Sequence, residues 1–285
     1  MTVTFVPQEL PAQILAPPRV SERHPWIYPL AVRYFRARRR VTWMRTRTAW
    51  ASVYSADPLA VRVKKHGSLL LRELSADEMA LQHNKVVNLR LACQRLDTLL
   101  IRPGETFSFN RAVGNCTRRK GYVEGMRLSN GDAVAGVGGG VCQLANLLHW
   151  MVLHAPLTVV ERSEHSFDPF PDKQRVLPWG VGCSIVYNYV DLVVRNDSPH
   201  TFQLRVWVDA HHLKGELRAD GLPDASYRVE ARDEVFWRHQ GRVYRTNEIW
   251  RTIHRRTDGV AVGDELLKRN CALVKYEPAG LVIDV

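Results

Sequence analysis

The sequence has few cysteines, and none of the spacings that mark a disulfide framework or a zinc finger. Five cysteines are spread over 285 residues, namely Cys93, Cys116, Cys142, Cys183 and Cys271. The odd count and the lack of a CxxC pair argue against both classes and favour a reducing compartment. We therefore expect neither a metal ion nor a cofactor.

Long apolar runs are also missing. No stretch approaches the ~20 apolar residues that a transmembrane helix needs. Residues 1–20 lack the basic segment and the continuous apolar core of a signal peptide. We expect a cytoplasmic protein, with a peripheral position on a membrane as the alternative.

Acidic residues are too few to balance the basic ones. The chain has 29 Asp and Glu against 40 Lys and Arg, a net charge of +11, which favours anionic partners. The segment 24–50, HPWIYPLAVRYFRARRRVTWMRTRTAW, places seven arginines among aromatic residues. Either its aromatics dock on the protein while the arginines are solvated, or it contacts an anionic membrane surface. No nucleic-acid-binding motif is present, so we expect no nucleic acid partner.

The hydrophobic spacing predicts an α+β fold. Residues 84–100 and 142–154 have the apolar periodicity of buried helices, whereas 157–162, 183–196 and the segments after 200 read as strands. Asn130-Gly131 reads as a hairpin turn, and Gln240-Gly241 and Asp258-Gly259 separate the strands of a C-terminal meander. We expect a mixed, largely antiparallel sheet with two main helices packed on it. We divide the chain into an arm and basic aromatic segment (1–50), an α+β domain (51–222) and a β meander or small β subdomain (223–285).

The stretch AGVGGGVCQLANLLH, residues 135–149, is the most distinctive part of the chain. Glycines let backbone N–H groups converge, and a helix that begins at Cys142 would lower the pKa of its thiol. A nucleophilic Cys142 would need a base, for which His165 is the candidate, and a group to orient that base, either Asp191 or Asp168. The alternatives are a tight turn beside a buried cysteine and a non-covalent ligand pocket.

Polar residues on the predicted helix favour a pocket. Cys142, Asn146 and His149 are spaced i, i+4 and i+7 and share a face, and Gln143 lies beside it. Buried amides are costly unless they are hydrogen-bonded. No spacing among the cysteines and histidines here is diagnostic of a metal site.

Four segments together resemble the VanW family, the accessory proteins found with B-type vancomycin-resistance genes. They are HPWIYPLAVRYFRARRR (24–40), NKVVNLRLACQRLDTLLIRPGETFSFNRAVG (84–114), GVGGGVCQLANLLHWMVLHAPLTVVER (136–162) and VDLVVRN (190–196). The resemblance implies a role in glycopeptide resistance or cell-wall metabolism, where precursors end in D-Ala-D-Ala or D-Ala-D-lactate. Family members often carry a histidine where this sequence has Ser163, which leaves His165 as the base candidate in ERSEHS.

Three functions follow from the residues and the resemblance. The first is an accessory protein that binds a peptidoglycan-related anion at the turn. Its ligand-binding residues would be Gly138, Gly139, Gly140, Gln143, Asn146 and His149. The second is a cysteine hydrolase or transpeptidase that acts on wall peptides through Cys142, His165 and Asp191. The third is a non-enzymatic scaffold on the membrane surface, held by residues 24–50.

Overall fold

The computed structural model describes residues 24–71, 76–129, 132–163, 167–168, 171–172, 176–278 and 282–284. Its α-helices are α3 (Tyr28–Arg45), α4 (Ala76–Leu96), α5 (Phe109–Val113) and α6 (Cys142–Val152), with 3-10 turns η1 (Pro25–Ile27) and η2 (Arg118–Lys120). The strands up to the middle of the chain are β1 (Val61–Leu69), β2 (Leu100–Ile101), β3 (Thr106–Ser108), β4 (Glu124–Ser129), β5 (Asp132–Val137), β6 (Thr158–Glu161) and β7 (Phe167–Asp168). The later strands are β8 (Val193–Arg195), β9 (Phe202–Val208), β10 (His212–Ala219), β11 (Ala225–His239), β12 (Arg242–Arg255), β13 (Ala261–Val274) and β14 (Val282–Asp284).

The main core lies between α4, α6 and a four-stranded antiparallel sheet of order β1-β10-β9-β2. Alternate side chains of β10 are buried, as a strand with one covered face requires. Gly215 of β10 lets α6 approach closely, because a Cβ there would meet Leu147 at 2.6 Å and Met151 at 2.8 Å. The predicted α+β class, with two main helices on a largely antiparallel sheet, is confirmed.

The first predicted helix is displaced toward the N-terminus, over 76–96 instead of 84–100. Thr98 has a φ of 71° and donates its N–H to Leu204, so the chain leaves the helix there. Leu100 and Ile101 then form β2 beside β9. An apolar run such as 99–101 fits both a helix end and a buried strand, which is why the boundary was wrong.

The prediction of a continuous strand over 183–196 was also wrong. Only Val193–Arg195 forms a strand, β8, which lies between β3 and β6. A turn interrupts the segment, with Asn188 at a φ of 54° between the bridged residues Val186 and Val190. The β-branched residues of this segment favour a strand, which is why one was predicted. The left-handed conformation of Asn188 nevertheless turns the chain there.

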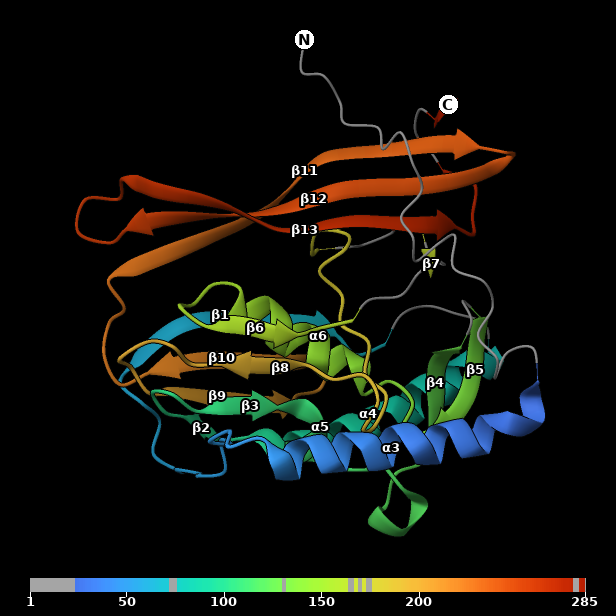
Figure 1. The fold of residues 1–285 in the computed structure, drawn as a ribbon, viewed down its shortest axis with the longest axis horizontal. Helices are drawn as coiled ribbons and strands as arrows, with labels where there is room; N and C mark the ends of the chain where they lie inside the picture. Colours follow the sequence, from blue (N-terminus) through green and yellow to red (C-terminus); the bar gives the residue numbers. More distant parts are fainter. Residues whose placement is uncertain are drawn as a thin grey trace.

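The C-terminal meander is confirmed as long strands β11, β12 and β13, which form a separate sheet with β14 and β7 (Figure 1). Both predicted turns lie where expected, with Gly241 and Gly259 at a φ of 73°. The β4–β5 hairpin also forms, pairing Ser129 with Asp132, although 130–131 lie outside the described residues. Trp150 and Leu153 from the end of α6 share a small core with this C-terminal sheet.

The basic aromatic segment forms α3, which runs along the edge of the molecule far from the meander in Figure 1. Arg39 forms two short hydrogen bonds with Glu161 of β6, at 2.5 and 2.6 Å. Phe35 packs on Tyr189 with ring centroids 4.8 Å apart. Near the C-terminal end of α3, the guanidinium of Arg111 lies over the rings of Trp43 and Trp50. Part of the predicted docking of the aromatics on the protein is thus observed.

Candidate functional site

The glycine turn leads directly into α6, which begins at Cys142 as the sequence predicted. Gly138 and Gly140 have φ values of 76° and 90°, a region that favours glycine. Gly139 packs against β4, because a Cβ there would lie 2.0 Å from the carbonyl oxygen of Gly125. Each glycine therefore has a conformational or packing reason to be present.

The predicted anion cradle is largely occupied by the protein itself. The Gly138 N–H donates to Val123 at 3.0 Å, and the Gly139 N–H donates to Gly136 at 2.9 Å. A Cβ on Gly140 would meet the alkyl chain of Lys85 at 2.1 Å. Two of the three glycine donors are already bonded, so the turn does not present a free ring of N–H groups. Ligand binding by these glycines stays a prediction.

Asn88 of α4 holds the turn in place, and the sequence analysis missed it. This side chain is fully buried. Its Nδ2 donates to the carbonyl oxygens of Gly139 at 2.9 Å and Val123 at 3.0 Å, and its Oδ1 accepts from the Val123 N–H at 2.9 Å. An asparagine within the apolar spacing of 84–100 was the available signal, because a buried amide needs partners.

The Cys142 thiol lies against the segment that follows Cys183. Its Sγ is 3.9 Å from the carbonyl oxygen of Ile185. Burial raises the pKa of the Cys142 thiol, outweighing the backbone hydrogen bonds that lower it. The predicted fall in the pKa of this thiol was therefore wrong, because desolvation is the larger effect. Burial likewise raises the pKa of Cys183 to about 12.

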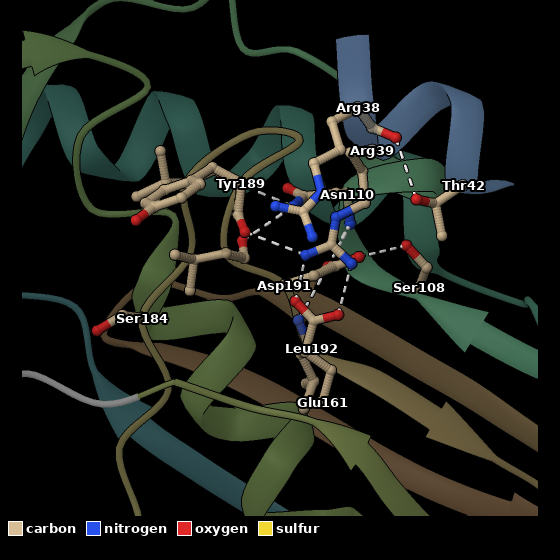
Figure 2. A network of polar contacts seen from close by, with 12 residues as sticks. Arg38, Arg39, Thr42, Ser108, Asn110, Glu161, Ser184, Tyr189, Asp191 and Leu192 are labelled. Carbon is tan, nitrogen blue, oxygen red and sulfur yellow. Dashed lines mark hydrogen bonds and ion pairs between the residues drawn. The ribbon is translucent and has the colours of Figure 1, made fainter. Parts of the chain in front are cut away.

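Asp191 is committed to the backbone, as Figure 2 shows. One carboxylate oxygen accepts from Ser108 Oγ at 2.5 Å, and the other accepts from the N–H groups of Asn110 and Leu192, both at 2.9 Å. Burial raises the pKa of Asp191 to about 6. These bonds fix the start of α5 beside the turn between Val186 and Val190. That turn contacts α3 through Tyr189. Asp191 therefore anchors this part of the fold, and its orientation of the His165 imidazole stays a prediction.

The base predicted for Cys142 is His165. His165 lies outside the described residues. The alternative acid, Asp168, belongs to the C-terminal sheet, where it accepts from Arg245 at 3.0 Å and from Tyr276 at 2.8 Å. Catalysis by Cys142 and His165 stays a prediction.

Gln143, Asn146 and His149 join α6 to neighbouring segments. Gln143 Nε2 donates to Ser68 Oγ and to the Leu69 carbonyl at 2.9 and 2.8 Å. Asn146 Oδ1 accepts from the Cys183 N–H at 2.6 Å. His149 Nδ1 lies 2.8 Å from the Val181 carbonyl, and burial lowers the pKa of the imidazole to about 3. The polar side chains that suggested a pocket therefore hydrogen-bond α6 to the end of β1 and to the segment 181–183.

A cavity of about 280 Å³ opens between α4 and η2. Its lining residues are Leu91, Gln94, Arg95, Lys120 and Tyr122. Tyr122 is buried and hydrogen-bonds to Cys116, whose Cβ lies where a side chain on Gly138 would be. Arg95 and Lys120 are exposed, and within the described part of the chain neither forms a salt bridge. The cavity is thus a small, positively charged pocket that shares the segment 116–123 with the turn.

The described residues contain no group of three or more His, Cys, Asp or Glu side chains placed to hold a metal ion. None of the described helices has both the length and the apolar character needed to cross a bilayer.

Comparison with known proteins identifies the family. The family model described as VanW like protein matches residues 84–218, which span α4 through β10. The vancomycin B-type resistance protein VanW of Enterococcus faecalis is 37% identical over 199 residues, covering 70% of this chain and 72% of that protein. The uncharacterized protein YoaR of Bacillus subtilis is 38% identical over 96 residues, 33% of this chain and 32% of that protein. No solved structure matches. The chain belongs to the VanW family, and the matched region contains both the glycine turn and the cavity.

Proposed function

We propose that this chain is an accessory protein of glycopeptide resistance and cell-wall metabolism that binds a wall peptide through its terminal carboxylate. The observation that carries the proposal is the cavity between α4 and η2, where Arg95 and Lys120 lie without acidic partners in the described structure. The name of the Enterococcus faecalis relative supports the biological setting.

The cavity suits the end of a D-Ala-D-Ala or D-Ala-D-lactate peptide. A carboxylate gains charge-assisted hydrogen bonds from a guanidinium and an ammonium group. Leu91 offers apolar contact for a methyl group, and the Gln94 amide can bond to the peptide linkage. This assignment places the anion in the cavity instead of on Gly138 and Gly139, whose N–H groups are bonded internally.

Calorimetric titration of the full chain with D-Ala-D-Ala and D-Ala-D-lactate peptides tests the proposal. Arg95→Gln and Lys120→Gln should each weaken binding by about tenfold or more, since a charged hydrogen bond contributes ~1.5–3 kcal/mol. Arg90→Gln on α4 and Arg119→Gln on η2 are matched controls, because both side chains are exposed and outside the cavity lining. These controls should bind as the parent does.

The carboxylate itself has a separate control. Peptides whose C-terminus is amidated should not bind. Absence of binding to the free acids, or equal affinity of the site variants and the controls, contradicts the proposal. If NMR titration changed the amide chemical shifts of residues 136–146 alone, the ligand would bind at the glycine turn instead of in the cavity.

A further inference from the structure

Helix α3 has two different faces: one contacts other described segments of the chain, and the side chains of the other are exposed. The inner face carries Phe35, Arg36, Arg39 and Trp43. Arg36 lies 5.4 Å from the ring centroid of Tyr187, and the other three make the contacts described above. Phe35 and Arg36 are neighbours, and Arg39 and Trp43 follow at spacings of three and four, so all four share one side of the helix and this side faces inward.

The outward face carries an apolar stripe. Its residues are Leu30, Tyr34, Ala37, Val41 and Met44, at successive spacings of four, three, four and three. That spacing keeps them on one side of a helix. Leu30 is 57% exposed, Tyr34 61% and Met44 78%. Near the start of the helix, Trp26 is exposed by 72%. Isolated exposed apolar residues are common, but a stripe along most of a helix marks an interaction surface.

Arginines border the stripe on both sides. Arg33 and Arg40 lie along one edge, and Arg38 and Arg45 lie along the other. All four side chains are exposed, and within the described structure none forms a salt bridge. The helix sequence contains no acidic residue. The outward face therefore combines apolar contact area with four cations that form no salt bridge with any described residue.

We propose that the outward face of α3 binds the surface of an anionic lipid bilayer. The stripe would enter the boundary between headgroups and acyl chains, and the arginines would reach lipid phosphates while their alkyl stems stay in apolar surroundings. Exposed Trp26 and Tyr28 suit the same interface. A second copy of the helix is a poorer occupant, because the arginines bordering each stripe would face one another.

Sedimentation of the full chain with lipid vesicles tests this surface. The chain should bind vesicles of phosphatidylcholine mixed with phosphatidylglycerol, and binding should fall at high salt or on vesicles of phosphatidylcholine alone. Replacing Arg33, Arg38, Arg40 and Arg45 by Gln should reduce partitioning at least about tenfold, because each arginine near an anionic surface contributes severalfold. Leu30→Ser with Val41→Ser and Met44→Ser should also weaken it at low salt.

A control variant with the same change in net charge distinguishes binding by this surface from attraction by the overall positive charge of the protein. Arg90, Arg119, Arg127 and Arg242 are exposed and outside α3, and their joint replacement by Gln should leave binding unchanged. Circular dichroism of every variant checks that the fold is retained. Equal loss in both arginine sets, insensitivity to salt, or no effect of the serine variant overturns the proposal. The proposal is also overturned if the chain binds RNA more tightly than vesicles and the serine variant binds RNA as the parent does.

Discussion

The side chain of Asn88 and the carbonyl of Gly139 are joined by a 2.9 Å hydrogen bond between α4 and the glycine turn. The same amide also bonds twice to the backbone of Val123. One buried side chain therefore fixes two loops, and the conformation of the turn depends on a residue about fifty positions earlier.

Asn88→Ala should destabilise the protein by about 2–4 kcal/mol, because it leaves buried backbone groups without partners. Urea denaturation measures the change. Asn84→Ala on the same helix is the control, since its bond to the Glu124 carbonyl is exposed and its loss should cost under about 1 kcal/mol. Equal effects of the two substitutions would contradict the role given to Asn88.

Gly139→Ala should be destabilising by about 2 kcal/mol or more, because its Cβ would lie 2.0 Å from the backbone oxygen of Gly125. Gly139 does not have a positive φ, so the effect would be steric. Gly67→Ala provides the comparison, since its nearest contact would be an ordinary 3.7 Å. The comparison variant should unfold at the parent's urea concentration or above it. Retention of full stability by Gly139→Ala would show that β4 moves easily away from the turn.

Alkylation of Cys142 by iodoacetamide at neutral pH should be at least about tenfold slower in the folded chain than in urea, because burial raises the pKa of the thiol. Peptide mapping by mass spectrometry follows each cysteine separately. Cys271, whose pKa burial raises to about 12, should be slow as well. Faster reaction of Cys142 in the folded state than in urea would restore the nucleophile hypothesis.

Acid should destabilise the protein through His149. Burial lowers the folded-state pKa of its imidazole to about 3 from an ordinary 6.5. The unfolded chain therefore binds an extra proton between these values. The stabilisation is present above pH 6.5 and is lost as the pH falls toward 3, by up to roughly 5 kcal/mol.

His149→Gln should reduce this dependence, measured as the difference in unfolding free energy between neutral and mildly acidic urea series. His154, whose pKa burial lowers to about 4, keeps part of the acid sensitivity in that variant. The exposed His83→Gln serves as the reference and should retain the slope of the parent. An unchanged slope in His149→Gln would contradict the assignment.

Local patterns were enough to predict some of the elements. Apolar spacing placed α6 within two residues, and Gln240-Gly241 and Asp258-Gly259 located the turns of the meander. The same reasoning failed for the segment 183–196. Its path depends on the turn at Asn188 and on the hydrogen bonds of Asp191 to residues distant in sequence.

The candidate site was harder to predict for a related reason. The glycines and Cys142 indicated where to look, but which backbone groups remain free depends on residues distant in sequence. Lys85, Asn88 and Val123 occupy the turn, and Arg95 and Lys120 meet at the cavity only because α4 lies beside η2. A buried polar residue in an apolar helix was the signal that carried the most information.

The pairing of β1 with β10 has a consequence for the order of folding. Val61 faces Ala219, so this ladder closes a loop of more than half the chain, whereas β11 pairs with β12, and β12 with β13, across short turns. Loop-closure entropy makes distant pairings slow. During synthesis the apolar faces of α4 and α6 emerge well before β9 and β10 can cover them. The meander, although made last, can assemble soonest after its residues appear, because its strands pair locally. Before β9 and β10 are made, the apolar faces of α4 and α6 have no sheet to cover them.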